Sequence, residues 1–335
     1  MVRGATLLIV LFFAWLLGGL ATAAEPSANI GFQNLTAPDA AGVPVEIGVW
    51  YPTDAVATPH ALAGWTQVVA PDAPPASGRR PLVVMSHGNG GWYAGHHDTA
   101  EALAHAGFVV AALTHPGDNY HDQSHATDMT ARPRELRWLV DYMLGGWAMK
   151  ASIDPKRIGA FGFSSGGFTT LVAIGGVPDF SLIPAHCRAH PAYFDCGLIR
   201  QSGRSAETMS DGLAARAWTH DARIKAAVVA APALGFTFAG AGLKGVTIPV
   251  QLWRAEDDHI LPHPDYAEAA RLALPSPPEY HVVANADHFD FLAPCYPELA
   301  RRLPLICASR PGFDRAAFHA RFDEAVAAFF EKTLG

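Results

Sequence analysis

The chain has 335 residues, of which 50% are hydrophobic and 16% are charged, and its formal net charge is −7. This length and apolar content predict a folded globular body with a large core and exclude a disordered chain. The mildly acidic balance, without any basic block, argues against nucleic acid as a partner.

The N-terminal segment has the pattern of a secretory signal peptide. Arg3 precedes an apolar run over residues 7–17, and small residues follow up to position 24. We expect cleavage after residue 24, so that the mature protein, residues 25–335, is periplasmic or secreted. An uncleaved membrane anchor is the alternative, but the run is short for a bilayer span. We therefore expect no stable membrane insertion after cleavage.

Strand-like and helical segments then alternate along the chain. Residues 45–53 alternate like an antiparallel edge strand, and further strands that leave through polar or glycine-rich loops are expected within 81–88, 107–117, 157–163, 224–234, 247–258 and 279–288. Helical spacing occurs within 96–107, 132–147, 164–176, 264–274 and 314–334. This order predicts an α/β protein with a mostly parallel central sheet and helices on both faces.

Two stretches interrupt this alternation. Residues 53–80 are rich in Pro, Ala and Gly and predict a long surface loop. Residues 177–222 predict a small cap-like insertion over the carboxyl ends of the strands, where open α/β sheets bind ligands. No internal repeat or second domain is visible, so residues 25–335 form a single expected domain.

Four cysteines lie in the exported part, at Cys187, Cys196, Cys295 and Cys307. An even number in an oxidising compartment predicts two disulfides, for which three connectivities exist. We favour Cys187 with Cys196 and Cys295 with Cys307, because both pairs close short loops and each would contribute about 2 to 3 kcal/mol. Free buried thiols are the alternative, and neither spacing resembles a zinc ribbon or finger.

A candidate nucleophile stands between a strand and a helix. Residues 162–166, Gly-Phe-Ser-Ser-Gly, match the G-x-S-x-G pattern of a nucleophile elbow, a sharp strand-to-helix turn that needs glycines. In this register Ser164 is the nucleophile, and the backbone N–H of Ser165 points at a developing oxyanion. The alternative is a glycine-rich helix start without chemistry.

A serine needs a histidine to take its proton and a carboxylate to orient that histidine. The order Ser, acid, His along the chain is met by Asp258 after one late strand and His288 after the next. Asp257 is the alternative acid, and His259 is a poorer candidate for the base because it adjoins the acid.

The second half of the oxyanion hole is expected in the loop after an early strand, within residues 86–91. The backbone N–H of Asn89 or Gly90 is the expected donor, and His87 is expected to be a structural loop residue.

Another polar stretch, residues 115–128, brings together His115, Asp118, His121, Asp122 and His125. Imidazole and carboxylate groups of this kind can bind a metal ion. We expect a polar loop after a strand and no metal site.

Several of these segments together resemble a known group of enzymes. The segments are VEIGVWYPT, VVMSHGNGG, HPGDN, GFSSGG, EDDHILP, HFDFLAPC and the tail ICASRPGFDRAAFHARF. They resemble the exported bacterial α/β-hydrolases described as predicted dienelactone hydrolases, which are similar in turn to platelet-activating-factor acetylhydrolases. The resemblance covers most of residues 40–333. It implies an α/β-hydrolase fold, no cofactor, and a triad of Ser164, Asp258 and His288 that acts on carboxylic esters.

Two departures from these relatives affect the expected substrate. True dienelactone hydrolases use a cysteine nucleophile, whereas position 164 is Ser, which favours ester cleavage over lactone opening. Platelet-activating-factor acetylhydrolases have His before the catalytic serine, whereas position 163 is Phe.

The expected function is therefore an exported serine hydrolase that cleaves small-molecule esters. A lactone, amide or peptide hydrolase with the same triad and a binding protein that keeps the scaffold without turnover are the alternatives. The oligomeric state and the physiological substrate are not readable from the sequence.

Overall fold

The computed structural model describes Met1, residues 29–214 and residues 217–335. Apart from Met1, the expected signal peptide lies outside the described residues. No helix in the described ranges is both long and apolar enough to cross a membrane.

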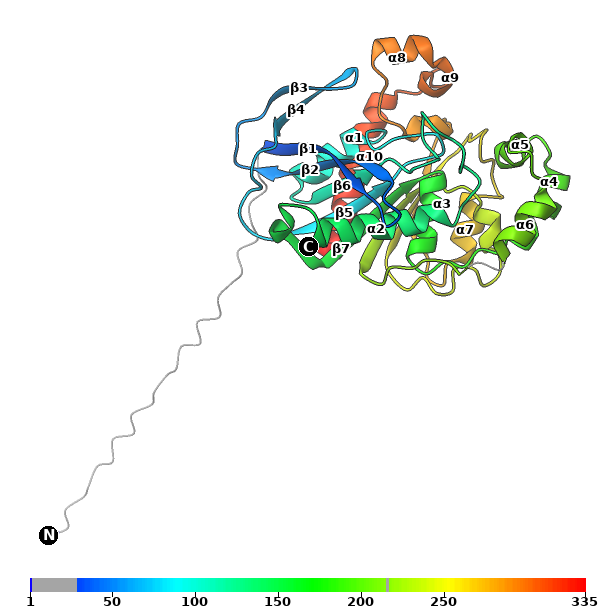
Figure 1. The fold of residues 1–335 in the computed structure, drawn as a ribbon, viewed down its shortest axis with the longest axis horizontal. Coiled ribbons are helices and arrows are strands. Elements are labelled where there is room, and N and C mark those ends of the chain that lie inside the picture. Colours follow the sequence, from blue (N-terminus) through cyan, green and yellow to red (C-terminus); the bar gives the residue numbers. More distant parts are fainter. Residues whose placement is uncertain (2–28, 215–216) are drawn as a thin grey trace.

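The molecule is built on one ten-stranded sheet whose spatial order is β10-β9-β8-β7-β5-β6-β2-β1-β4-β3 (Figure 1). The six strands from β10 to β6 are mutually parallel, whereas β2 is antiparallel to both β6 and β1. The strands are β1 (Asn29–Pro38), β2 (Pro44–Thr53), β3 (Thr58–Leu62), β4 (Trp65–Pro71), β5 (Arg80–Ser86), β6 (Val109–Leu113), β7 (Ile153–Phe163), β8 (Ile224–Ala230), β9 (Val250–Ala255) and β10 (Glu279–Val283). The predicted α/β class with a mostly parallel sheet is confirmed.

Two predictions for the N-terminal part are wrong. The strand expected at 45–53 is not at the sheet edge, because β1 pairs with it over its whole length and β4 and β3 extend the sheet further. Residues 53–80 are not one loop, because β3 and β4 form an antiparallel hairpin there. These strands contain prolines and exposed positions, so they lack the apolar pattern from which a strand is predicted.

Helices cover both faces of the sheet and enclose two separate hydrophobic clusters. Helices α1 (His97–His105) and α10 (Arg315–Leu334) pack together on one face, and α2 (Ala131–Gly145), α3 (Ser165–Ala173) and α7 (Ala267–Ala273) lie on the other (Figure 1). Alternate residues of each strand enter the two clusters. In β5, for example, Val83 belongs to one cluster and Val84 to the other.

Short helices complete the fold outside these layers. The region expected as an insertion, 177–222, contains η2 (Phe180–Leu182), α4 (Ile183–Ala189), α5 (Phe194–Gln201) and α6 (Ala206–Ala214), and the last three lie together at one end of the molecule (Figure 1). The remaining ones are η1 (Lys150–Ser152), η3 (Gly235–Phe238), η4 (His288–Phe291), α8 (Pro297–Arg302) and α9 (Pro304–Cys307).

Both favoured disulfide pairings are confirmed. Cys187 in α4 bonds to Cys196 in α5, and Cys295 bonds to Cys307 at the end of α9. No free cysteine remains. The first bond ties the insertion helices together, and the second closes the segment that follows η4.

Candidate active site

Ser164 occupies the sharp turn between β7 and α3, with backbone angles of φ 55° and ψ −117°. This conformation is costly for a residue with a side chain, by about 1 to 3 kcal/mol, and needs firm support. The Ser164 N–H donates to the Ala230 carbonyl, and its own carbonyl accepts from Ala233 N–H at 2.9 Å. The neighbouring strand β8 and its exit loop therefore hold the serine in place.

The elbow requires its two flanking glycines. A Cβ at Gly162 would lie 2.0 Å from the carbonyl oxygen of Gly166, and a Cβ at Gly166 would lie 1.9 Å from that of Ser86. No side chain fits at either distance. The G-x-S-x-G pattern thus lets β7 and α3 approach each other and β5 closely, with Ser164 in the turn at the carboxyl edge of the sheet.

The predicted serine, histidine and acid lie in one hydrogen-bonded chain. The Ser164 hydroxyl lies 3.0 Å from His288 Nε2, and His288 Nδ1 lies 2.8 Å from Asp258 Oδ2. The second carboxylate oxygen of Asp258 accepts the backbone N–H groups of Ile260 and Leu261. Since that carboxylate accepts the Nδ1 proton, the imidazole presents an unprotonated Nε2 to the serine, as a general base requires.

The structure separates Asp258 from its alternative. Asp257 is exposed and forms an ion pair with Arg310, and its backbone N–H donates to the Ala286 carbonyl. His259 contacts Asp287 and not Ser164. Neither Asp257 nor His259 therefore belongs to the hydrogen-bonded chain at Ser164.

The backbone N–H groups expected to bind an oxyanion lie at the start of α3 and in the loop after β5. Ser165 is the first residue of α3, where a helix leaves its N–H groups without partners inside the helix. In the loop after β5, the Gly90 N–H already donates to Asp118 Oδ1 at 3.0 Å, and the Asn89 amide group donates to the same oxygen. Because the Gly90 N–H is committed to Asp118, the backbone N–H of Asn89 is favoured over it as the expected donor.

A buried ion pair fixes this loop, and the sequence did not point to it. Arg132 Nε donates to Asp118 Oδ2 at 2.7 Å, while its other nitrogens donate to the carbonyls of His87 and Gly88. Burial alone would raise the pKa of Asp118, but the Arg132 charge and the Gly90 N–H outweigh it and hold this pKa below its usual value. The pair therefore stays charged and holds residues 87–90 against the sheet.

His87 has the structural role that was expected. Its Nε2 accepts the backbone N–H of His115, and its Nδ1 lies 2.6 Å from the Gly88 carbonyl. Burial, together with the nearby Arg132, lowers the pKa of His87 well below its ordinary value. His87 is thus a neutral spacer in the loop.

A second serine, histidine and acid form another hydrogen-bonded chain, which begins at Ser86 at the end of β5. The Ser86 hydroxyl lies 2.8 Å from His115 Nε2, and His115 Nδ1 lies 2.6 Å from Glu135 Oε2. Burial and the neighbouring Arg132 lower the pKa of His115 well below its ordinary value, and burial raises the pKa of Glu135 to about 7. This arrangement is not predictable from the sequence, because Glu135 is an ordinary residue of a predicted helix.

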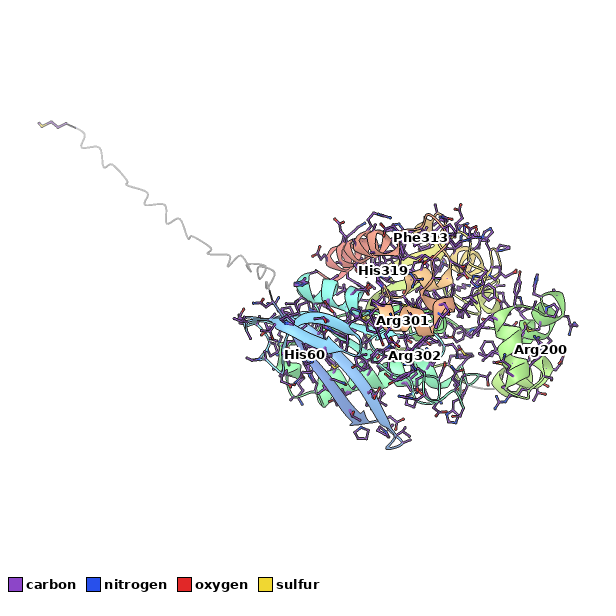
Figure 2. All side chains as sticks on the ribbon, turned by 90° about the horizontal axis from the view of Figure 1, so that it is seen from above. His60, Arg200, Arg301, Arg302, Phe313 and His319 are labelled. Carbon is purple, nitrogen blue, oxygen red and sulfur yellow. A yellow bond between two sulfur atoms is a disulfide. The ribbon has the colours of Figure 1, made fainter. Side chains whose placement is uncertain are left out.

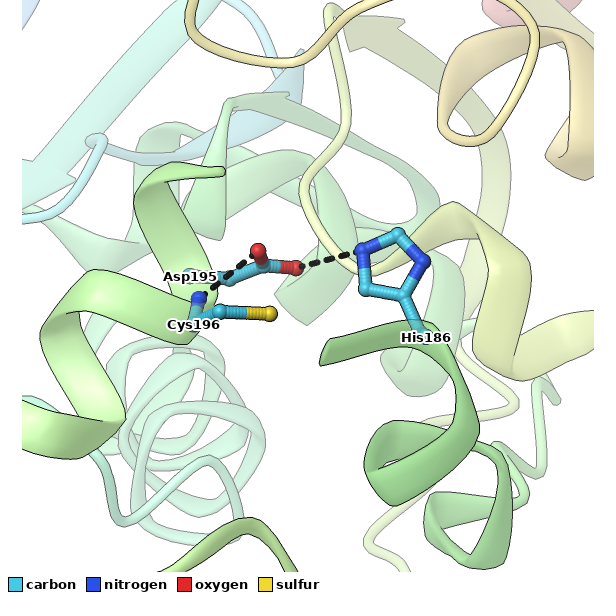
Figure 3. Close-up of side chains that lie close together, drawn as sticks. All are labelled: His186, Asp195 and Cys196. Atoms are coloured by element: carbon cyan, nitrogen blue, oxygen red, sulfur yellow. Dashed lines mark hydrogen bonds and ion pairs between the residues drawn. The ribbon is translucent and has the colours of Figure 1, made fainter. Parts of the chain in front are cut away.

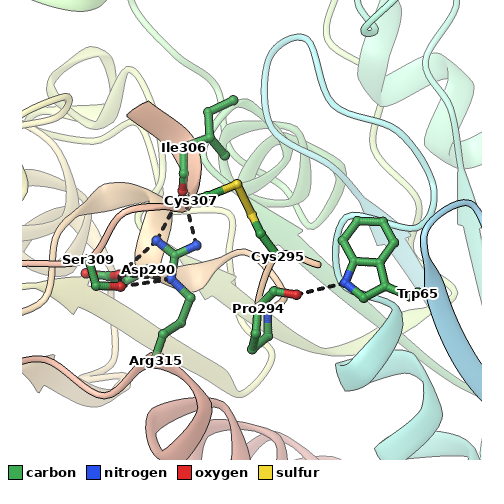
Figure 4. The surroundings of a disulfide bond; sticks show 8 residues. All are labelled: Trp65, Asp290, Pro294, Cys295, Ile306, Cys307, Ser309 and Arg315. Atoms are coloured by element: carbon green, nitrogen blue, oxygen red, sulfur yellow. Dashed lines mark hydrogen bonds and ion pairs between the residues drawn. A yellow bond between two sulfur atoms is a disulfide. The ribbon is translucent and has the colours of Figure 1, made fainter. Parts of the chain in front are cut away.

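A network of hydrogen bonds around Asp290 supports the loop that contains His288. Asp290 Oδ2 accepts the Asp287 N–H, and Asp290 Oδ1 accepts from Ser309 and Arg315 (Figure 4). Arg315 also donates to the carbonyl of Ile306, beside the Cys295–Cys307 bond. This network and the disulfide hold the segment after β10, and with it the histidine, against α10.

The residues of the polar stretch at 115–128 are not brought together as metal ligands. Within the described ranges, two other groups bring three possible ligand atoms within 4.8 Å of one another: His186, Asp195 and Cys196, and Asp98, His319 and Asp323. In the first group, His186 and Asp195 face each other across α4 and α5, but Cys196 is in a disulfide and offers no thiolate (Figure 3).

Comparison with solved structures identifies the architecture. A ferulic acid esterase from Streptomyces cinnamoneus superposes with a TM-score of 0.62, covering 94% of this chain and 92% of that one at 21% sequence identity. The chain has the α/β-hydrolase fold. No protein-family model matches this chain, and no curated protein sequence does.

Proposed function

We propose that this α/β-hydrolase is an exported serine hydrolase that cleaves carboxylic esters through Ser164, His288 and Asp258. The observation that carries the proposal is the continuous hydrogen-bonded chain from the Ser164 hydroxyl through His288 to Asp258, with the serine in a strained elbow at a helix N-terminus. Strain of this kind persists where the surrounding structure enforces it, most often at functional sites.

In the acylation half-reaction, Ser164 Oγ attacks the ester carbonyl carbon while His288 Nε2 takes the hydroxyl proton. The carbonyl oxygen becomes an oxyanion, which accepts hydrogen bonds from the backbone N–H groups of Ser165 and Asn89. Such a donor is worth about 3 to 4 kcal/mol of transition-state stabilisation. The imidazolium, stabilised by Asp258, then gives its proton to the departing alcohol, and an acyl-enzyme remains.

Deacylation repeats these roles with water as the nucleophile. His288 Nε2 takes a proton from water as the water oxygen attacks the acyl carbon, and the same donors hold the second oxyanion. Collapse of this intermediate returns the proton to Ser164 Oγ and releases the carboxylic acid. No step of this cycle calls for a metal or cofactor.

The choice of an ester as substrate has two supports. A protein with a similar fold is a ferulic acid esterase, and the sequence segments that resemble exported hydrolases include the elbow and both partner loops. In this proposal helices α4, α5 and α6 act as the cap and influence which acyl and alcohol groups fit. The two disulfides agree with folding in an oxidising compartment after export.

The test is hydrolysis of p-nitrophenyl esters from acetyl to long acyl chains by the mature chain, beside aminoacyl anilides. We expect ester turnover that Ser164→Ala abolishes and that Ser165→Ala retains, because Ser165 contributes its backbone N–H. Turnover of anilides without esters would replace the ester assignment by amide cleavage. Undiminished turnover in pure Ser164→Ala protein would contradict the proposal.

A further inference from the structure

The polar loop between β6 and α2 packs on the loop after β5, which carries the expected oxyanion donor. Asp118 accepts two hydrogen bonds from that loop, and the Tyr120 N–H donates to the Gly91 carbonyl at 3.2 Å. The loop after β5 also approaches the nucleophile, since a Cβ on Gly88 would lie 3.3 Å from Ser164 Cβ. A single short loop thus separates Tyr120 from the reacting serine.

The polar loop is fixed by hydrogen bonds of its own, although its tip is exposed. The side-chain oxygen of Asn119 accepts the His121 N–H, and its side-chain amide donates to the His115 carbonyl. The His125 N–H donates to the Gly117 carbonyl at 2.7 Å. A loop that is ordered in advance loses little conformational entropy when a ligand binds to it.

Tyr120 ends a row of three aromatic rings. Its ring centroid lies 5.7 Å from that of Trp92, and the Trp92 centroid lies 6.3 Å from that of Trp65, at an interplanar angle of 27°. The Trp65 indole N–H donates to the Pro294 carbonyl, which fixes this end of the row (Figure 4). Both tryptophans are half-buried. Tyr120 is 53% exposed even though the His121 ring lies 3.8 Å from its own, so the row presents an open ring at this end.

The row begins on the side of the molecule away from the cap helices. Trp65 is the first residue of β4, and Figure 2 shows the β3–β4 hairpin, marked by His60, at the opposite end from the insertion helices, marked by Arg200. An ester has two groups, one on each side of its carbonyl carbon. A substrate bound at Ser164 with one group beneath the cap would direct the other toward this row.

We propose that Tyr120, backed by Trp92, binds an aromatic ring on one of the two groups of the ester substrate. The inference rests on the proposed ester hydrolysis, because it uses the position of a substrate at Ser164. Aromatic rings attract each other in offset-stacked or edge-to-face contacts at centroid distances of about 4.5 to 7 Å. A tyrosine suits this role because it offers a large contact area with few rotatable bonds. Tyr120 takes no part in proton transfer and determines specificity through binding.

Pairs of esters that differ only in aromaticity test the proposal. Methyl 3-phenylpropanoate is compared with methyl 3-cyclohexylpropanoate for the acid side, and benzyl acetate with cyclohexylmethyl acetate for the alcohol side, by pH-stat titration of the released acid. In one of the two pairs we expect kcat/KM of the wild type to be about 3 to 10-fold higher for the aromatic member, through a lower KM. Equal kcat/KM within both pairs would overturn the proposal.

A variant and a matched control locate the effect. Tyr120→Leu should bring the ratio of kcat/KM within the pair to about 1, because leucine keeps an apolar side chain without a ring. Tyr142→Leu is the control, since Tyr142 stacks on Trp138 at 5.6 Å within α2, and it should keep the ratio of the wild type. A ratio that survives in folded Tyr120→Leu, or that Tyr142→Leu abolishes equally, would contradict the assignment.

Binding to the Ser164→Ala protein separates this ring site from the proposed hydrolysis. By saturation-transfer NMR, the aromatic member of a pair should bind about 3 to 10-fold more tightly than the saturated one, and Tyr120→Leu in the same background should remove the difference. This preference in binding, without turnover of any ester by the wild type, would support the ring site and reject ester hydrolysis. Ester turnover without the preference would support hydrolysis and reject the ring site.

Discussion

Two sets of serine, histidine and acid lie in this fold at nearly the same distances and in different surroundings. Ser164, His288 and Asp258 are linked at 3.0 and 2.8 Å, and Ser86, His115 and Glu135 at 2.8 and 2.6 Å. Distances between side chains therefore do not distinguish the two sets. What distinguishes them is the backbone conformation around each serine and the charge beside each histidine.

Ser164 stands in a strained turn at the start of a helix, whereas Ser86 is the last residue of β5. Ser86 pairs with β6 and β7 on its two sides and is 1% exposed, against 8% for Ser164. Burial, together with the nearby Arg132, lowers the pKa of His115, which opposes the imidazolium that proton transfer would create. We therefore expect the second set to be structural.

The largest expected effect concerns the two serines. Ser164→Ala should lower kcat/KM for a p-nitrophenyl ester by at least about 10⁴-fold, because the nucleophile is lost. Ser86→Ala should keep kcat/KM within about threefold and lower the free energy of unfolding by about 1 kcal/mol, through the lost hydrogen bond to His115. Equal losses of activity in two folded variants would break the distinction.

The second largest effect on activity is expected for one of the two neighbouring acids, Asp258 and Asp257. Asp258→Asn should lower kcat by about 10³ to 10⁴-fold, because an amide cannot hold the imidazole in the required tautomer. Asp257→Asn removes only an exposed ion pair with Arg310. It should leave kcat within about twofold and lower the free energy of unfolding by about 0 to 1 kcal/mol. A large effect at Asp257 would move the acid to that residue.

A smaller effect on kcat is expected when residues 87–90, the loop with the expected Asn89 donor, lose their support. Arg132→Gln breaks the buried pair with Asp118 and should lower the free energy of unfolding by about 3 to 5 kcal/mol. We expect kcat to fall by about 10 to 100-fold while KM changes little, because residues 87–90 lose their support. Arg310→Gln, at an exposed ion pair, is the matched control. An unchanged kcat in folded Arg132→Gln would show that the loop does not depend on this pair.

The smallest effect is a pH dependence at the second set. The folded protein holds a proton on Glu135 up to about pH 7, while the unfolded chain releases it near the ordinary value of 4.5. The stability from this proton is complete below pH 4.5 and is lost as the pH rises through 7. Glu135→Gln, which stays neutral, should therefore gain about 1 to 2 kcal/mol over the wild type between pH 5 and pH 8, measured by urea unfolding with disulfides intact. The same difference at both pH values would contradict a buried protonated Glu135.

The sequence predicted the parts of the fold that depend on local patterns. The parallel strands are continuous apolar runs, and the elbow requires glycines at fixed spacing, so both can be predicted from the sequence. The pairing of β1 with β2 and the hairpin of β3 and β4 were missed because these strands mix prolines, polar residues and exposed positions, which leave little apolar pattern.

In the candidate site, too, some contacts were predicted from the sequence and others were not. Ser164, Asp258 and His288 follow strands in the order that the fold demands, and the structure brings them together. Other contacts join residues that are far apart in the chain. They are the hydrogen bond from the Gly90 N–H to Asp118, the ion pair of Arg132 with Asp118, and the cluster of Asp98, His319 and Asp323. No spacing rule links such residues, so only the three-dimensional structure reveals them.

The most direct test of the central claim is covalent labelling of the wild-type protein with a fluorophosphonate, followed by peptide mass mapping. An activated serine displaces fluoride and retains the phosphonate, while a buried scaffold serine does not react. We expect one adduct per chain, on Ser164, loss of esterase activity in step with labelling, and no adduct on Ser86. An adduct on Ser86, or full labelling of Ser164→Ala protein, would contradict it.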